Sequence, residues 1–391
     1  MELTLSDRIQ TLSPSLTIAI TTLAKELKAE GKDILSFSAG EPDFGTPKRI
    51  KEEAIKAIND GFTQYTAVPG IPELLEAVTQ KLERDNGLKY APSDIIVSNG
   101  AKQSLFNLFQ ATLNPGDEVI IPAPYWVTYP ELVKYAGAVP VTIETNDITE
   151  FKITPEQLEA AITPKTKMLI LTTPSNPTGS VYSKEELEAI AEVLKGTDIL
   201  VASDEMYEKL VYGIDFTATA SISEDMYQRT VTINGLSKSV AMTGWRFGYL
   251  ASPNKALIAA MNKLQSQSTS NINSITQKAA IPALLGEVDD EIEMMRQAFE
   301  KRAQEALALI NDIDGLSAIT PKGAFYLFVN IKEVSNDSIA FCKELLQETG
   351  VAVVPGIGFG SEGYFRFSFA TDITTIREGI RRIGKFVESK R

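Results

Sequence analysis

The residues best suited to chemistry lie in segment 234–248, which reads NGLSKSVAMTGWRFG. This segment follows a short apolar, β-branched run at 230–233, which predicts a buried strand. Ser237 and Lys238 occupy a glycine-flanked bend, and Arg246 follows eight positions after the lysine. A lysine amine can form a Schiff base with an aldehyde cofactor, while a hydroxyl and a guanidinium can hold the cofactor's phosphate. The alternative is an ordinary loop with one solvated lysine.

Composition limits the chemistry that these residues can serve. The 391 residues include no histidine, which excludes histidine-based catalytic triads and histidine metal sites. Proton transfer must then fall to lysine, tyrosine, a carboxylate or a cofactor, and we expect no metal. The net charge of −13 argues against nucleic-acid and membrane partners, because phosphate backbones and anionic lipids repel an acidic surface.

Length and cysteine content indicate the kind of protein. A chain of 391 residues is too long for one compact core, so two domains are the default expectation. The sequence has no apolar run near the length of a membrane span, and its polar start carries no secretory signal. The single cysteine, Cys342, excludes an intrachain disulfide and fits a reducing compartment. We therefore expect a cytoplasmic protein.

Helices and short apolar strands alternate between residues 71 and 251, a pattern that is typical of a mainly parallel sheet covered by helices. Further helices are expected within 5–31, with a break at 13–15, and at 47–61. The seven strands predicted for this sheet are 95–98, 118–122, 139–143, 168–171, 199–203, 231–234 and 247–251.

The pattern changes after about residue 282. A long amphipathic helix at 289–311 precedes strand-like segments at 325–330, 351–354 and 363–370, and a final helix ends the chain. We expect an α+β unit here, completed by the N-terminal segment.

Polar and aromatic residues gather at the carboxyl ends of the predicted parallel strands, where open α/β sheets bind ligands. They are Gly100, Ala101 and Lys102 after the first strand, Trp126 beyond the second, Asn176 beyond the fourth, Asp204 and Tyr207 at the fifth, and Ser237 and Lys238 at the sixth.

Each of these residues has a chemical interpretation and an ordinary one. Backbone amides at Gly100 could hold a phosphate at a helix start, although many α/β turns look similar. Trp126 could stack on a planar ring or belong to the core. Asp204 could keep a pyridine nitrogen protonated, or it could cap a following helix. Asn176 and Tyr207 could bind the ring's phenolic oxygen, or serve as turn and packing residues.

Arg366 lies in an otherwise apolar strand, which is a costly position for a charge. Its guanidinium suits a substrate carboxylate, and a structural ion pair is the alternative.

Taken in order, these positions resemble the pyridoxal-phosphate-dependent aminotransferases of fold type I, class I, over nearly the whole chain. The resemblance is closest to the bacterial-type aspartate aminotransferases of subgroup Iβ. It is carried by AGEPDF at 39–44, Tyr65 with Gly70, GAKQ at 100–103, PYW at 124–126, SNPTG at 175–179, SDEMY at 203–207, SK at 237–238, GWR at 244–246, and Arg366.

The resemblance implies an α/β PLP-transferase fold. A large domain at 46–290 would hold the seven-stranded, mainly parallel sheet. A smaller α+β domain, formed by 1–45 and 291–391, would close over the substrate and exclude water.

The resemblance also implies pyridoxal 5′-phosphate as cofactor and a role for each residue. Lys238 would carry the Schiff base and then move the proton at the substrate Cα. The phosphate would be held by Ser237, Arg246, the Gly100-Ala101-Lys102 turn and, from the partner subunit of a homodimer, Tyr65. Trp126 would stack on the ring, Asp204 would pair with its nitrogen, and Asn176 and Tyr207 would contact its 3′-oxygen. The substrate α-carboxylate would be bound by Arg366 with Gly40, Trp126 and Asn176.

Substrate choice depends on Lys102 and Thr17, which match the residues that bind a distal carboxylate in this subgroup. Amino acids and 2-oxo acids are therefore the expected partners, with L-aspartate and 2-oxoglutarate giving oxaloacetate and L-glutamate by ping-pong kinetics. Relatives that also use prephenate tend to carry a basic residue where this chain has Ser13, which argues against prephenate without excluding it. An aspartate/prephenate aminotransferase, another class I specificity, a β-lyase and a non-catalytic effector-binding relative stay open as alternatives.

Overall fold

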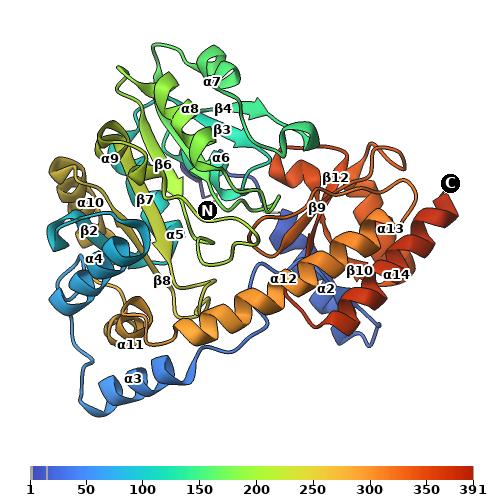
Figure 1. Cartoon of the computed structure of the whole chain (residues 1–391), viewed down its shortest axis with the longest axis horizontal. Helices are drawn as coiled ribbons and strands as arrows, with labels where there is room; N and C mark the ends of the chain where they lie inside the picture. Colours follow the sequence, from blue (N-terminus) through green and yellow to red (C-terminus); the bar gives the residue numbers. More distant parts are fainter. Residues whose placement is uncertain (1–2, 15, 391) are drawn as a thin grey trace.

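The structure is a computed structural model that describes residues 3–14 and 16–390, without the side chain of Thr17. Figure 1 shows two unequal parts, a larger one around a seven-stranded sheet and a smaller one around a three-stranded sheet. The long helix α12 (Asp289–Asn311) runs from one part to the other. Within the described residues, no helix is long and apolar enough to cross a membrane.

The larger sheet contains all seven predicted strands, in the order β2-β8-β7-β6-β5-β3-β4. Strands β3 to β7 pair in parallel, whereas β8 is antiparallel to both of its neighbours. The predicted mainly parallel α/β sheet is therefore confirmed. Its strands are β2 (Ile95–Asn99), β3 (Glu118–Ala123), β4 (Val139–Glu144), β5 (Thr166–Thr172), β6 (Leu200–Asp204), β7 (Thr230–Gly235) and β8 (Phe247–Ala251).

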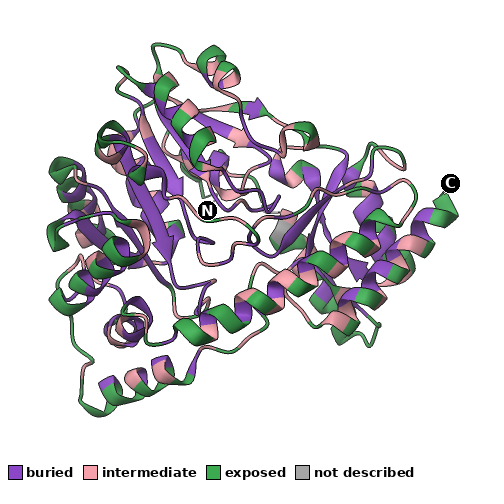
Figure 2. Ribbon diagram, viewed as in Figure 1, coloured by how far each residue is buried: buried purple, intermediate pink, exposed green. Residues whose placement is uncertain are grey.

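These strands were predictable because the central ones are buried on both faces and are therefore apolar along most of their length. Figure 2 shows the strands of this sheet as mostly buried, with exposed residues concentrated on the covering helices. Those helices are α4 (Pro72–Asn86), α5 (Ala101–Thr112), α6 (Thr128–Tyr135), α7 (Pro155–Ala161), α8 (Lys184–Leu194), α9 (Glu224–Arg229), α10 (Lys255–Ser268) and α11 (Ser274–Leu284). Helix α3 (Lys48–Asn59) packs on α11 instead.

Local sequence fixes where several of these helices begin. At the start of α8 the Ser183 hydroxyl accepts the Glu186 N–H at 3.3 Å, and the Glu186 carboxylate accepts the Ser183 N–H at 2.8 Å. This reciprocal capping satisfies two backbone amides that have no hydrogen-bond partner within the helix.

Single 3₁₀ turns lie at Pro92–Asp94, Asp147–Thr149, Thr219–Ser221 and Gly356–Phe359.

The smaller part holds an antiparallel sheet in the order β11-β12-β9 and a separate parallel pair, β1 with β10. Its strands are β1 (Leu35–Ser36), β9 (Tyr326–Asn330), β10 (Val351–Ala352), β11 (Val354–Pro355) and β12 (Tyr364–Ser368). Its helices are α2 (Leu16–Ala29), α13 (Ser338–Thr349) and α14 (Ile373–Lys390). The short helix α1 (Asp7–Gln10) instead contacts α6 of the larger part.

The prediction of one strand over 351–354 is wrong. Val351 and Ala352 pair with β1, whereas Val354 and Pro355 pair with β12 in a different sheet. A pattern of apolar residues cannot distinguish one long strand from two short ones with different partners. The domain boundaries near residues 45 and 290 stay predictions.

Candidate active site

A cavity of about 1170 Å³ opens at the carboxyl ends of the parallel strands and extends to the smaller part. Of the predicted site residues other than Thr17, all but Gly100 and Tyr65 line it. Those lining it are Gly40, Ala101, Lys102, Trp126, Asn176, Asp204, Tyr207, Ser237, Lys238, Arg246 and Arg366.

Lys238 is partly buried three residues after β7, and its Nζ donates a hydrogen bond to the Gly40 carbonyl oxygen. Burial, reinforced by the positive charges of Arg366 and Arg246, lowers the pKa of this amine to about 8. Lys238 is therefore not the solvated lysine of an ordinary loop. The lowered pKa increases the fraction of neutral amine near neutral pH, and the neutral amine is the form that acts as a nucleophile.

A cradle for an anion forms where α5 begins. Gly100 has φ +79°, and a Cβ there would lie 2.3 Å from Nη2 of Arg246. A Cβ at Gly248 would likewise lie 2.3 Å from the backbone nitrogen of Ala101. Two glycines thus allow the helix start and the guanidinium to approach each other. With the Ser237 hydroxyl on the same cavity wall, these donors fit a phosphate group.

Asp204 ends β6 and is buried, with 5% of its surface exposed. Its Oδ2 accepts a hydrogen bond from the Tyr129 hydroxyl at 2.7 Å, and its Oδ1 accepts the Met206 N–H at 3.2 Å. Burial raises the pKa of Asp204, and these two donors act in the opposite direction. The segment that follows Asp204 is a turn, so the alternative of an N-cap for a helix does not apply.

Lys102 and Trp126 lie together on the cavity wall. The Lys102 Nζ lies 4.9 Å from the centroid of the Trp126 ring, which is a cation–π contact. Burial and the nearby Arg246 charge lower the pKa of Lys102. Lys102 is exposed to the cavity, so a carboxylate brought to this wall would meet an accessible cation.

Arg366 is 2% exposed, and its described contacts are neutral. Its Nη1 donates to Oδ1 of Asn176 at 2.9 Å and its Nη2 donates to the Ser38 carbonyl at 2.8 Å. Its guanidinium lies 4.4 Å from the Tyr326 ring and 5.0 Å from the Phe359 ring.

The Nε of Arg366 has no hydrogen-bond partner among the residues that the structure describes. Burial lowers the pKa of the guanidinium, which reflects the cost of leaving this charge without an anion. The geometry therefore favours an anion-binding arginine over a structural ion pair.

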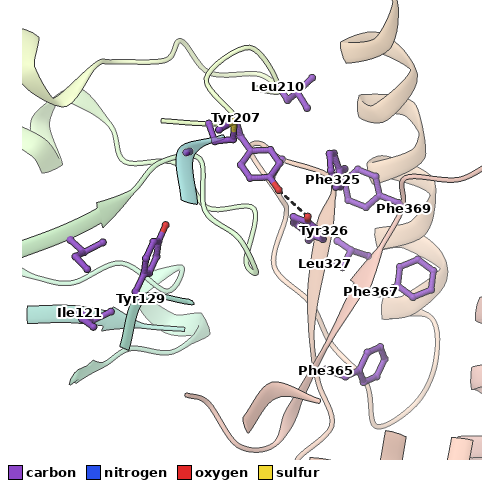
Figure 3. Close-up of a cluster of buried hydrophobic side chains, with 14 of the residues drawn as sticks. Ile121, Tyr129, Tyr207, Leu210, Phe325, Tyr326, Leu327, Phe365, Phe367 and Phe369 are labelled. Carbon is purple, nitrogen blue, oxygen red and sulfur yellow. Dashed lines mark hydrogen bonds between the residues drawn. The ribbon is translucent and has the colours of Figure 1, made fainter. Parts of the chain in front are cut away.

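Tyr207 lies deep in the cavity wall, and its hydroxyl is 2.9 Å from the hydroxyl of Tyr326 (Figure 3). Burial raises the pKa of Tyr207 well above its ordinary value, so this hydroxyl stays protonated and can donate.

The donor set fits pyridoxal 5′-phosphate as a whole. The cradle at Gly100 suits the phosphate, and the carboxylate of Asp204 suits a ring N–H. The Tyr207 hydroxyl can donate to a phenolic oxygen, and the Lys238 amine can reach an aldehyde. Each of these groups faces one cavity or adjoins it.

One predicted residue lies away from this cavity. Tyr65 is 91% exposed and does not line the cavity of its own chain. The side chain of Thr17 lies outside the described residues, although its neighbours Leu16 and Ile18 line the cavity.

Sequence reasoning missed Tyr129, Tyr326 and Ser38. Tyr129 follows Trp126 by three residues, which is about one helical turn, and this spacing could have revealed it. Tyr326 lies in an apolar strand like its neighbours, and Ser38 contributes a backbone carbonyl, so no side-chain pattern distinguishes either residue.

Comparison with known proteins agrees with this geometry. A curated aspartate/prephenate aminotransferase of Nitrosomonas europaea is 49% identical, over 98% of this chain and 99% of that protein. An aspartate aminotransferase of Geobacillus stearothermophilus is also 49% identical, over 99% of both chains. The structure of the Thermus thermophilus aspartate aminotransferase with maleate superimposes with a TM-score of 0.95 at 43% identity, over 98% of this chain and 100% of that one.

This structural agreement confirms the predicted fold class. The sequence model of the family described as aminotransferase class I and II matches residues 32–383. On the evidence of this match and of the relatives, this chain belongs to the class I and II aminotransferase family.

Proposed function

We propose that the chain is a pyridoxal-phosphate-dependent aspartate aminotransferase, which transfers the amino group of L-aspartate to 2-oxoglutarate. The observation that carries this proposal is the guanidinium of Arg366, which is buried, is hydrogen-bonded to uncharged groups and lines the same cavity as the Lys238 amine. An amino acid bound by its α-carboxylate at Arg366 would present its amino group and Cα to Lys238. The two residues would thus position the reacting atoms.

Pyridoxal 5′-phosphate, when bound, supplies an electron sink for the negative charge that forms at the substrate Cα. Lys238 would attach the cofactor and, once displaced by substrate, would be a free amine beside the Cα proton. Its lowered pKa, about 8, suits an amine that must accept and return this proton. Asp204, as a carboxylate, would keep the ring nitrogen protonated.

Ser237, Arg246 and the backbone from Gly100 to Lys102 would hold the phosphate. Trp126 would stack on the ring, and Asn176 and Tyr207 would contact its 3′-oxygen. Gly40, Trp126 and Asn176 would assist Arg366 in binding the substrate.

The preference for a dicarboxylic substrate rests on Lys102 and Thr17. Lys102 places its ammonium group on the cavity wall beside Trp126, where it can meet a distal carboxylate. Two of the relatives described above carry aspartate aminotransferase names, and the Thermus thermophilus structure is with maleate, a dicarboxylate. These names support the same substrate class for this chain.

Prephenate is a second candidate acceptor, because the Nitrosomonas europaea relative is named for both substrates. The cavity mouth of this chain includes Ser13, whose N–H donates to the Glu131 carboxylate at 2.6 Å. Glu131 is itself paired with Lys134 at 3.1 Å, and Ser13 offers no positive charge to a second carboxylate on a bulky acceptor. We therefore place prephenate below 2-oxoglutarate.

We further propose that the active protein is a homodimer in the cytoplasm. Tyr65 is presented outward on a loop that Gln277 secures, because the amide of Gln277 bonds to Thr66 and Ile71 at 2.9 Å each. Such a tyrosine can reach the phosphate of a second copy. Residues 1–45 and 291–391 would form the domain that closes over the substrate.

The experiment is a stopped-flow half-reaction in which the purified protein with its cofactor is mixed with aspartate, glutamate, alanine or phenylalanine. Loss of the absorbance of the lysine-bound cofactor is followed for each donor. Aspartate and glutamate should react fastest, Lys102→Gln should remove this preference, and Arg366→Lys should slow all four donors. Fastest reaction with alanine or phenylalanine would contradict the dicarboxylate assignment.

A further inference from the structure

Tyr129 connects two walls of the cofactor cavity. It lies in α6 with 1% of its surface exposed, and its hydroxyl is 2.7 Å from Oδ2 of Asp204. The same hydroxyl is 2.9 Å from Oγ1 of Thr172 at the end of β5. Its ring meets the Trp126 ring edge to face, with centroids 5.5 Å apart and planes at 88°. Figure 3 shows its hydroxyl pointing away from Ile121.

The ability of each group to donate or accept decides which way the hydrogen bonds among Thr172, Tyr129 and Asp204 run. An ionised Asp204 carboxylate can only accept, so the proton on the Tyr129 hydroxyl must point to Asp204. The Tyr129 oxygen is then left as an acceptor, and the Thr172 hydroxyl donates to it. The direction therefore runs from Thr172 through Tyr129 to Asp204.

The consequence concerns the second oxygen of Asp204. Oδ2 is occupied by the short bond from Tyr129, while Oδ1 receives, among the described residues, only a longer bond from the Met206 N–H. Because Asp204 lines the cavity, Oδ1 is the atom available to a ligand N–H. A hydrogen bond to a carboxylate is stronger than one between neutral groups, so Tyr129 also stabilises the ionised form.

We propose that Tyr129 is a positioning residue for the cofactor, holding Asp204 as an oriented carboxylate against the ring nitrogen and bracing the Trp126 ring that stacks on it. This inference rests on the proposed cofactor. Tyr129 acts through Asp204 and Trp126 and makes no contact with the reacting atoms.

Removing the hydroxyl has a defined effect. Burial already raises the pKa of Asp204, and Tyr129 is the largest influence that opposes burial. Without the hydroxyl, a larger fraction of Asp204 is protonated, and the ring nitrogen loses its anionic partner. A neutral ring nitrogen withdraws electrons less well, so loss of the Cα proton becomes slower.

The test compares Tyr129→Phe with two other variants. Tyr182→Phe is the matched control, because Tyr182 is also buried but does not line the cofactor cavity. Its hydroxyl accepts a hydrogen bond of 3.0 Å from the Ile153 N–H. Thr172→Val removes the donor to Tyr129 while leaving Tyr129 in place. Each protein is loaded with pyridoxal 5′-phosphate that carries ¹⁵N in the ring, and the ¹⁵N chemical shift is recorded against pH.

The wild-type resonance should lie in the pyridinium range. Tyr129→Phe should move it toward the neutral-pyridine range, Thr172→Val should move it less, and Tyr182→Phe should leave it in place. The kcat with aspartate should fall roughly 10- to 100-fold in Tyr129→Phe, with KM changed far less. A general structural defect would not produce this selective change in the ring nitrogen.

The outcomes separate the two claims. If Tyr129→Phe binds the cofactor and keeps the wild-type ¹⁵N shift, the positioning role is wrong while the proposed function stands. If Tyr129→Phe does not fold, the test rests on Thr172→Val. A ¹⁵N shift in Thr172→Val equal to that of the wild type then overturns the inference. If the wild-type chain gives no bound-cofactor signal, the proposed function fails and the inference fails with it.

Discussion

The hydroxyls of Tyr207 and Tyr326 lie 2.9 Å apart, although the two residues are 119 positions apart in the sequence. Tyr207 follows strand β6 of the large sheet, and Tyr326 begins strand β9 of the small one. The ring of Tyr326 also lies 4.4 Å from the guanidinium of Arg366. This pair therefore joins the residue proposed for the cofactor's 3′-oxygen to the residue proposed for the substrate carboxylate.

Tyr326→Phe should destabilise the cofactor-free protein more than the cofactor-bound one. The variant keeps the ring over Arg366 but leaves the buried Tyr207 hydroxyl without its partner, which costs about 1–3 kcal/mol. Bound cofactor would give that hydroxyl a new acceptor. Urea unfolding with and without pyridoxal 5′-phosphate measures the difference.

The control is Tyr364→Phe, which removes a buried hydroxyl from the neighbouring strand, where it accepts a bond from Lys332 at 3.1 Å. Its loss of stability should be the same with and without cofactor. Equal losses in both forms of Tyr326→Phe would show that the tyrosine pair has no connection with the cofactor.

Gly100→Ala should weaken binding of the cofactor. The added Cβ would lie 2.3 Å from Nη2 of Arg246 and would displace it from the cradle. Loss of one charge-assisted contact to phosphate corresponds to at least a tenfold rise in Kd, or about 1.4 kcal/mol. Fluorescence titration of the cofactor-free protein with pyridoxal 5′-phosphate gives the Kd.

Gly87→Ala separates this effect from backbone strain. Gly87 also has a positive φ, +67°, but its added Cβ would meet nothing within 4 Å. It should lower stability by about 1 kcal/mol and leave the Kd unchanged. A Kd for Gly100→Ala equal to that of the control variant would argue against the phosphate cradle.

Stability of the cofactor-free protein should depend on pH through Lys238. Its pKa is about 8 in the folded protein against 10.5 for an unperturbed lysine, so the unfolded chain binds more protons between these values. Stability therefore rises with pH across this window. Below pH 8 the buried charge costs on the order of 3 kcal/mol.

Lys238→Met removes this charge. The cofactor-free variant should be more stable than the wild type at pH 7, and its advantage should shrink as the pH approaches 10.5. Urea unfolding at several pH values measures it, and Lys48→Met on the exposed face of α3 reports any general effect of removing a charge. If the difference in stability between the variant and the wild type is the same at pH 7 and pH 10, the pKa of Lys238 is not lowered in the folded protein.

Subunit mixing should restore activity if Tyr65 acts across a dimer interface. Tyr65→Ala should bind the cofactor weakly, and Lys238→Ala should be inactive. In a mixed dimer, one site carries both defects and the other carries neither. Equal mixing should recover about a quarter of the wild-type sites at limiting cofactor. No recovery, with mixed dimers verified by mass spectrometry, would place Tyr65 outside the partner's site.

The sequence predicted the large sheet and most residues of the candidate cavity for a common physical reason. Strands such as β3 are buried on both faces, so Val119, Ile120 and Ile121 form a continuous apolar run. The ligand-facing residues then follow at strand ends, and Asp204 and Lys238 fall where that rule places them.

Contacts between segments that lie far apart in the sequence could not be predicted in this way. The bond from Tyr129 to Asp204 spans 75 positions, and the division of 351–354 into two strands depends on partners elsewhere in the chain. A tyrosine is equally polar, and a valine equally hydrophobic, whichever distant residue it pairs with, so the residue type does not reveal the partner. Such pairings are fixed by tertiary packing.

The most direct test of the central claim follows the amino group itself. The purified protein, supplied with pyridoxal 5′-phosphate, is incubated with ¹⁵N-labelled L-aspartate and 2-oxoglutarate, and the products are analysed by mass spectrometry, with Lys238→Ala as control. The account predicts that ¹⁵N appears in L-glutamate, with an equal amount of oxaloacetate, and that the control transfers none. Unlabelled glutamate, or transfer that persists without Lys238, would contradict it.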